Sequence, residues 1–245
     1  MTPPRQKEHH RLQQERHSGQ DVVGTRLREA VFGLQDGLIS TMGALTGIAA
    51  GTQSGEAVVV AGFVIIAVES LSMAAGSYLS SKSQREYLER LLREEEEEIA
   101  NEPEKERQEI WEMYRSRGYH DDEIAVIAKR LMSDPKLLLE DMAHKELGIS
   151  PATLEEPLGN AFVMGTAYVA GGLVPVLPYL LLPIHAAMPI AVAGTLAVLF
   201  LFGGLKGRLV RQSWWRSGLE MLGVAGLAAL AGFLIGRFAA RWVPR

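Results

Sequence analysis

The sequence predicts an all-α, polytopic membrane protein with five transmembrane helices and an acidic helical domain inserted between the second and the third. Two observations predict this class. Residues 157–205 contain no Asp, Glu, Lys or Arg, far beyond the roughly 18 apolar residues that mark a membrane span. Between Glu86 and Glu156 lie 21 acidic and 10 basic residues, whereas the rest of the chain holds 8 and 15. A basic apolar part that carries an acidic polar part indicates two functional units.

The membrane spans follow from the lengths of the apolar runs. A helix of about 20 residues crosses a hydrocarbon core of about 30 Å. Runs of this length predict spans at about residues 30–51, 57–79, 158–182, 186–205 and 218–239. The expected parts are a disordered polar arm (1–25), the first two helices (26–80), the inserted domain (81–156) and the last three helices (157–245).

Lys and Arg predict the orientation of these spans. The connections near residues 52–56 and 182–188 contain neither residue, whereas the arm beside the first span and the 206–216 connection are basic. The positive-inside rule therefore places the arm, the insertion and the 206–216 connection in the cytoplasm. Five spans place the C-terminus outside the cytoplasm. The three arginines after residue 236 are therefore a weak exception to the positive-inside rule.

The insertion has the start and stop signals of short helices and no strand signal. The second span continues beyond residue 81 without a breaker. Pro103 can open the next helix and Gly118 can end it, while Asp134 followed by Pro135 is a strong signal for a capped helix start. We expect that last helix to stop at Gly148.

Several acids of the insertion fall on the apolar faces of these helices. Seven residues are about two helical turns, so Glu95 and Glu98 continue the stripe that begins with Leu88 and Leu91. Acids at core-facing positions are costly unless they are paired or bound to metal. If the helices pack by their apolar faces, six side chains converge: Glu95, Glu98, Glu106, Glu109, Met142 and Glu146.

The alternative interpretation is a solvated acidic face, since some members of a run of five glutamates fall on any helical stripe by chance. We expect this for Glu94, Glu96 and Glu97. For the converging set we favour a metal site, which makes the insertion a cytoplasmic helical metal-binding domain. Carboxylates suit hard to borderline cations, and the Met142 thioether shifts the preference towards Fe²⁺ and later transition metals.

Two carboxylates lie within the predicted spans. Asp36 opens the first span and Glu69 lies midway through the second. An ionisable residue at this depth costs about 2.5–3.5 kcal/mol, so each is a functional candidate. Asp36 could instead cap a helix near the interface. Met73 shares the face of Glu69, although a methionine on an apolar helix more often packs than binds a ligand.

Other chemistry finds no support in the sequence. There is no Gly-x-Ser-x-Gly elbow, phosphate-binding loop or His-Glu-x-x-His pattern, so we do not expect an enzyme. The absence of cysteine excludes disulfides and thiolate metal sites. The basic 206–216 connection suits contact with the head groups of a lipid bilayer rather than nucleic acid.

Two segments resemble signatures of the vacuolar iron transporter family. Residues 36–49, Asp-Gly-Leu-Ile-Ser-Thr-Met-Gly-Ala-Leu-Thr-Gly-Ile-Ala, are similar to its first-span signature. Residues 71–84, Leu-Ser-Met-Ala-Ala-Gly-Ser-Tyr-Leu-Ser-Ser-Lys-Ser-Gln, are similar to its second-span signature. The acidic insertion resembles the cytoplasmic metal-binding domain of that family. The resemblance covers about residues 26–240, but the last three spans match only in pattern.

The resemblance implies the same six metal ligands in the insertion that the helical stripes select. It also implies that Asp36 and Met73 line the translocation path, in a homodimer with five spans per subunit and a pore between subunits. Family members move Fe²⁺ out of the cytoplasm against protons. Many have an acid where this chain has Ser77, and Glu69 is a candidate to replace it.

The resulting hypothesis is an Fe²⁺ exporter driven by H⁺ antiport, with Asp36, Glu69 and Met73 along the path. One alternative is an exporter of Mn²⁺ or of divalent metals broadly. An alternative of another class is a membrane-anchored metal sensor or scaffold that transports nothing. The absence of an organelle signal leans towards a prokaryotic inner membrane.

Overall fold

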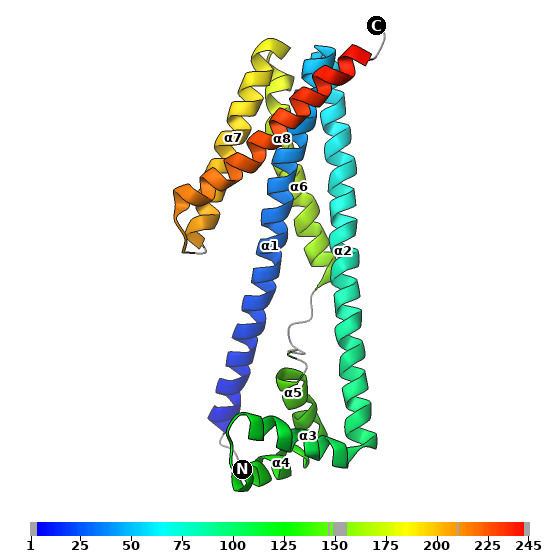
Figure 1. Cartoon of the computed structure of the whole chain (residues 1–245), viewed down its shortest axis with the longest axis vertical. Helices are drawn as coiled ribbons and strands as arrows, with labels where there is room; N and C mark the ends of the chain where they lie inside the picture. The colour runs from blue at the N-terminus through cyan, green and yellow to red at the C-terminus, as the bar shows by residue number, and fades with distance from the viewer. Residues whose placement is uncertain (1–3, 147, 149–155, 210, 243–245) are drawn as a thin grey trace. The chain divides into compact units, whose positions relative to one another are not determined.

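The computed structural model describes residues 4–146, 148, 156–209 and 211–242, with the backbone alone for 4–22 and 239–242. These residues form helices and no strand (Figure 1). In chain order the helices are α1 (Pro4–Thr52), α2 (Gly55–Asn101), α3 (Pro103–Ser116), α4 (Asp121–Leu131), α5 (Pro135–Lys145), α6 (Pro157–Leu181), α7 (Ile184–Leu209) and α8 (Trp214–Trp242).

The chain divides into two compact units. Unit 1 comprises Met1–Gly24 and Leu79–Glu156, and unit 2 comprises Thr25–Tyr78 and Pro157–Arg245. Helix α2 runs without interruption through the boundary, as the lack of a breaker after residue 81 predicted. Helix α1 begins at Pro4, within the predicted polar arm. Residues 5–18 contain neither Gly nor Pro, and such a stretch favours a continuous helix.

Unit 2 consists of helices suited to a bilayer. Four helices in the described part of the chain are long and apolar enough to cross a membrane: α2, α6, α7 and α8. Helices α6, α7 and α8 match the last three predicted spans within a few residues, and α2 begins close to the start of the second predicted span but continues to Asn101. The first predicted span forms the end of α1, which is rich in Gly, Ser and Thr and does not qualify by apolarity. A fifth span remains a prediction.

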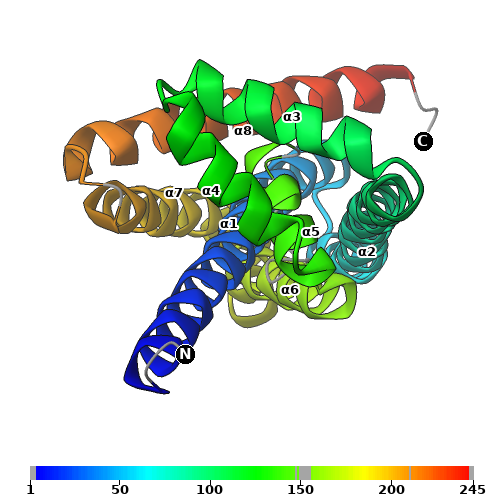
Figure 2. The same cartoon turned by 90° about the horizontal axis from the view of Figure 1, so that it is seen from below.

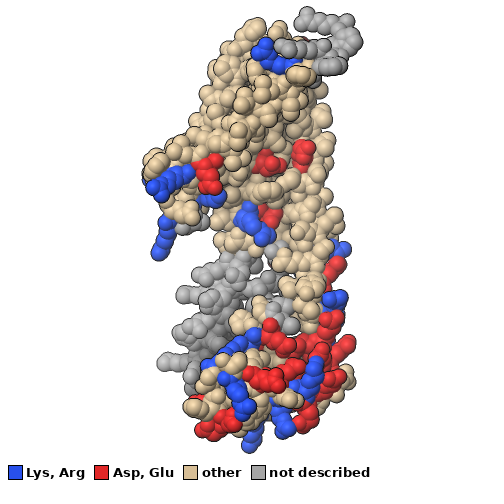
Figure 3. Space-filling model, viewed as in Figure 1, with Lys and Arg blue, Asp and Glu red and all other residues tan. Residues whose placement is uncertain are grey.

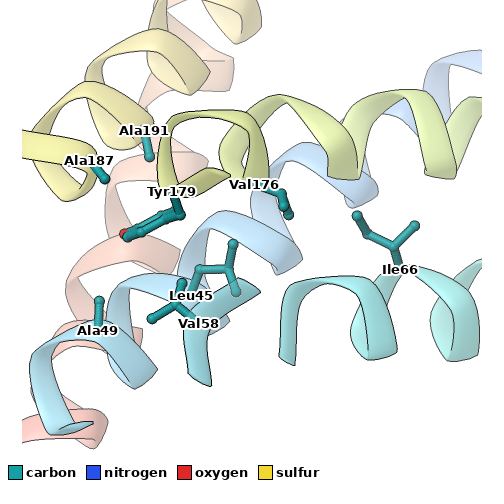
Figure 4. Packing of buried hydrophobic residues seen from close by; sticks show 8 residues of the cluster. All are labelled: Leu45, Ala49, Val58, Ile66, Val176, Tyr179, Ala187 and Ala191. Carbon is teal, nitrogen blue, oxygen red and sulfur yellow. The ribbon is translucent and has the colours of Figure 1, made fainter. Parts of the chain in front are cut away.

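Helix α1 is nevertheless a core helix of unit 2. Its Leu38, Met42 and Leu45 are at most 1% exposed. A helix that neighbours shield from lipid needs less apolar character than one facing the bilayer. Figure 4 shows one cluster of this core, to which α1, α2, α6 and α7 contribute Leu45, Ala49, Val58, Ile66, Val176, Tyr179, Ala187 and Ala191.

Glycines bring the backbones of unit 2 into contact. A Cβ at Gly37 of α1 would lie 2.3 Å from the carbonyl oxygen of Tyr168 in α6. On the α8 side of α1, a Cβ at Gly47 would lie 2.6 Å from the carbonyl oxygen of Gly232, and one at Gly236 would lie 2.0 Å from that of Gly47. These small residues let membrane helices pack without intervening side chains.

Unit 1 has its own small core, and α3, α4 and α5 follow one another in a zigzag around it (Figure 2). These three helices contribute Ile110, Ile124 and Leu138 to the core, and Ile99 of α2 packs against it. The predicted start of α5 is confirmed, since the carboxylate of Asp134 accepts a hydrogen bond from the backbone N–H of Leu137 at 3.4 Å. Gly118 has φ of +90° just after α3, where its lack of a Cβ permits the turn.

Candidate functional site

Two glutamates of unit 1 are buried without a hydrogen-bond partner for at least one oxygen. Glu106 of α3 is fully buried, and neither of its carboxylate oxygens has a partner. Glu95 of α2 is 7% exposed, and its Oε1 is also unpartnered. A buried carboxylate without a partner is strongly disfavoured in its charged form. In their charged forms, these two side chains therefore destabilise the fold of unit 1.

The charges of the predicted ligands act on one another. Burial first, and then the charges of Glu106 and Glu146, raise the pKa of Glu95 to about 7. Burial, followed by the charges of Glu109 and Glu146, raises the pKa of Glu106 to about 7. The pKa of Glu146 is raised as well, by desolvation and then by Glu109 and Glu98. Carboxylates from α2, α3 and the end of α5 therefore share one electrostatic environment.

Lys105 provides a positive charge within this group. Its ammonium donates a hydrogen bond to Glu98 and lies 3.6 Å from Oε1 of Glu109. The hydrogen bond to Glu98 is the main cause that raises the pKa of Lys105. The same ammonium opposes the rise in the pKa of Glu106. Lys105 thus occupies the place where a cation would meet Glu98 and Glu109. Helical periodicity did not predict this pairing.

Helix α5 supplies the remaining two predicted ligands. Met142 is fully buried in the core of unit 1, and Glu146 is an exposed residue at the end of α5. A network fixes α5 against α3: the hydroxyl of Tyr114 donates to Asp141 at 3.0 Å, and Lys145 pairs with both residues. Helix packing therefore determines where Met142 lies.

The arrangement is not a closed coordination shell. Among the residues that the structure describes, no group of three or more His, Asp or Glu side chains stands in position to hold an ion. The Lys105 ammonium pairs with both Glu98 and Glu109. Glu94, Glu96 and Glu97 are exposed, as the helical stripe predicted. The space-filling view shows how acidic side chains gather on unit 1 (Figure 3).

The predicted path residues lie on α1 and α2 of unit 2. Asp36 and Met73 are partly buried, whereas Glu69 is exposed on the surface of the unit. The Ser40 hydroxyl donates to the backbone carbonyl of Asp36 at 2.7 Å and lies 2.7 Å from the Tyr168 hydroxyl. Because Ser40 has a single hydroxyl proton, Tyr168 donates to Ser40.

Sequence reasoning missed a further polar pair in unit 2. Glu29 is 7% exposed, and its Oε2 accepts a hydrogen bond of 2.8 Å from the Ser77 hydroxyl. Glu29 precedes the first long apolar run, so a search confined to uncharged stretches passes over it. Its spacing of seven residues from Asp36 places both on one helical face and was a usable signal.

Comparisons with known proteins identify the family. The model of the VIT family matches residues 27–237. The chain belongs to the VIT family. It is 32% identical to Vacuolar iron transporter 1 of Arabidopsis thaliana over 218 residues, which cover 88% of this chain and 87% of that protein. It is 33% identical to Vacuolar iron transporter 2 of Oryza sativa subsp. japonica over 213 residues, with 86% and 87% covered.

A more distant VIT-family relative is Protein CCC1 of Saccharomyces cerevisiae, 26% identical over 223 residues, with 87% of this chain and 69% of that protein covered. Family membership and the apolar helices of unit 2 make this chain an integral, multi-pass membrane protein. The matched range includes Asp36, Glu69 and Met73 as well as the six predicted ligands of unit 1.

Proposed function

We propose that this VIT-family chain exports Fe²⁺ from the cytoplasm by H⁺ antiport, with unit 1 as a cytoplasmic capture site for the ion. Family membership supports metal transport, and the relatives from Arabidopsis and rice are named as iron transporters. The observation that carries the capture role is the pair of buried glutamates Glu95 and Glu106: both oxygens of Glu106 and Oε1 of Glu95 lack a hydrogen-bond partner. A divalent cation would supply the missing positive charge.

Capture requires rearrangement of side chains. The cation would displace the Lys105 ammonium from Glu98 and Glu109 and draw Glu95 and Glu106 towards itself. Met142 offers a thioether that favours Fe²⁺ over Mg²⁺ or Ca²⁺. The core of unit 1 holds α3 and α5 in place, so only the acidic side chains need to move.

Transport itself would use Asp36, Glu69 and Met73 in unit 2. In this mechanism the cation binds between the two carboxylates, and protons from the far side replace it there. We propose that a second copy of the chain covers Glu69, because an exposed carboxylate midway along a span is costly in lipid. The homodimer would place the path between the subunits.

A flux assay in proteoliposomes tests this function. We expect anaerobic Fe²⁺ movement that depends on a proton gradient and is lost in Asp36→Asn and Glu69→Gln. Purified, folded protein that moves no metal under any gradient contradicts transport. A membrane-anchored sensor or scaffold predicts that both variants keep their cellular function, while Glu95→Gln and Glu106→Gln abolish it.

A second candidate cargo is Mn²⁺, or divalent metals broadly. Five of the six predicted ligands in unit 1 are carboxylates, and oxygen ligands suit Mn²⁺. Competition between Fe²⁺ and Mn²⁺ in the same flux assay distinguishes the two. Equal inhibition by either ion favours the broad exporter. The prokaryotic inner membrane remains our prediction for location, which fractionation of the native host tests.

A further inference from the structure

A pocket of about 340 Å³ lies at one end of unit 2, between α1, α7 and α8. Most of its wall is apolar and comes from Ala49 and Ala50 in the last turn of α1, Ile184 and Met188 near the start of α7, and Phe233 of α8. Because α1 ends and α7 begins here, the pocket lies where the spans leave the hydrocarbon and meet the lipid head groups.

Three polar side chains complete the pocket: Gln53, His185 and Arg237, all of them exposed. The Arg237 guanidinium lies 5.6 Å from the centre of the Phe233 ring, and no carboxylate of the described residues forms an ion pair with it. His185 belongs to the first turn of α7, where backbone N–H groups lack intrahelical acceptors and the helix dipole favours an anion. No acid is among the described residues that line the pocket, so its polar side suits a negative ligand.

A buried hydroxyl beside the pocket has no hydrogen-bond partner among the described residues. It belongs to Tyr179 of α6, which is 6% exposed. Figure 4 shows its ring pointing away from α6, with the hydroxyl end between Ala49 and Ala187. Ala49 also lines the pocket, and Met188 of the pocket wall packs against the same cluster. Since an unpartnered buried hydroxyl is costly, a ligand that accepts its hydrogen bond would bind more tightly.

We propose that this pocket binds a phospholipid with an anionic head group. The Arg237 guanidinium can donate two parallel hydrogen bonds to the phosphate, beside the first turn of α7. One acyl chain would follow the apolar walls. The Tyr179 hydroxyl would donate to an ester carbonyl of the same lipid once the flexible side chain of Met188 turns aside. The apolar walls disfavour a free phosphate ion, and this site does not depend on the proposed transport function.

A simpler role for Arg237 makes a different prediction. A long basic side chain near the end of a span often extends its charge into the head-group region without selecting a lipid. In that case Arg237→Gln leaves the affinity for every phospholipid as it was. If the pocket selects an anionic lipid, the same variant weakens that lipid and removes its advantage over a zwitterionic one.

Native mass spectrometry of the full-length protein in detergent, titrated with dioctanoylphosphatidylglycerol or dioctanoylphosphatidylcholine, measures both affinities. We expect wild type to bind the phosphatidylglycerol about tenfold more tightly, and Arg237→Gln to lose this difference, because one charge-assisted contact is removed. Arg107→Gln is the matched control, since it removes an exposed arginine of unit 1 and should bind as the wild type does. Equal affinities of the wild type for the two lipids, or wild-type affinities in Arg237→Gln, overturn the proposal.

A second pair of variants locates the lipid without any change of charge. Ala50→Phe adds a ring inside the pocket, whereas Ala186→Phe adds one at an exposed position of α7 that does not line it. We expect Ala50→Phe to abolish the preference for phosphatidylglycerol and Ala186→Phe to keep it. Arg237→Gln should then cause no further loss in the Ala50→Phe background, because both changes act on one site. A full preference in Ala50→Phe places the lipid elsewhere and overturns the proposal.

Two further measurements test the occupant itself. Tyr179→Phe should weaken phosphatidylglycerol several-fold while the lipid-free protein unfolds at the wild-type temperature or above it, because the lost hydroxyl has no partner there. An unchanged affinity contradicts the part assigned to Tyr179. Inorganic phosphate at the concentration of the lipid should displace none of it. Displacement by phosphate alone would assign the pocket to a small anion and overturn the lipid.

Discussion

Replacing Glu106 by Gln removes the most deeply buried acid of unit 1 with little change of shape. Both oxygens of Glu106 lack partners, and burial with neighbouring carboxylates raises its pKa to about 7. Glu95 has a pKa raised to about 7 for the same reasons. A cation that binds these carboxylates must displace their protons. Metal affinity should therefore depend on pH in the range where ordinary glutamates are already ionised.

The size of the effect follows from these pKa values. A group with a pKa of about 7 is protonated in about 90% of molecules at pH 6 and about 10% at pH 8. Its contribution to binding is present above pH 7 and lost below it. The dissociation constant should rise about tenfold from pH 8 to pH 6 for each group, or about 1.4 kcal/mol. Glu95 and Glu106 together give about a hundredfold, and Glu106→Gln should reduce this to about tenfold or less, because it also removes a charge that raises the pKa of Glu95.

Calorimetric titration of full-length protein with Mn²⁺ in detergent, at pH 6 and pH 8, measures this change. Glu97→Gln is the matched control, because Glu97 is exposed on the same acidic run of α2. Its pH dependence should equal that of the wild type. Carboxylates of unit 2 are common to all three proteins, so the difference between variants isolates Glu106.

Two results would refute the reasoning. One is a wild-type affinity that is the same at pH 6 and pH 8, since the buried acids would then not be ligands. The other is a Glu106→Gln variant with the full wild-type pH dependence, which would assign the titrating groups to another site.

Two further changes probe features described above. Lys105→Gln should tighten Mn²⁺ binding about threefold at pH 8, because it frees Glu98 and Glu109 from an exposed ion pair. An unchanged or weaker affinity in the same titration would argue that Lys105 supports the site. Gly37→Ala should destabilise unit 2 by about 2 kcal/mol or more and lower its thermal unfolding temperature in detergent, because the added Cβ meets the backbone of α6. Gly194→Ala is the control: its added Cβ meets nothing within 4 Å, so the variant should unfold as the wild type does.

Much of the helical architecture could be predicted because it depends on local signals. Long apolar runs predicted α6, α7, α8 and the first part of α2, and the Asp134–Pro135 pair predicted the start of α5. The end of α1 shows the limit of this logic. A helix must be strongly apolar only where it faces lipid. The end of α1 is packed against other helices, so its glycines lower its mean apolarity while it stays in the core of unit 2.

The candidate site was predictable to the extent that helical periodicity controls it. The stripe argument separated the buried Glu95 from the exposed Glu97. Periodicity could not indicate that Lys105 would pair with Glu98, because the two lie on different helices and their contact depends on the turn between them. The hydrogen bond from Ser77 to Glu29 was likewise hidden, since it joins residues 48 positions apart through the packing of α1 on α2.

The glycines at which α1 and α8 touch have a consequence for how this protein varies by mutation. Every single-nucleotide change of a glycine codon that alters the amino acid adds at least a Cβ or ends the chain. At Gly47, Gly232 and Gly236 that Cβ would overlap the backbone of the facing helix. These positions carry no charge, ligand or hydrogen-bonding side chain. Yet we expect a library of variants to retain glycine there more strictly than it retains Glu96 or Glu97.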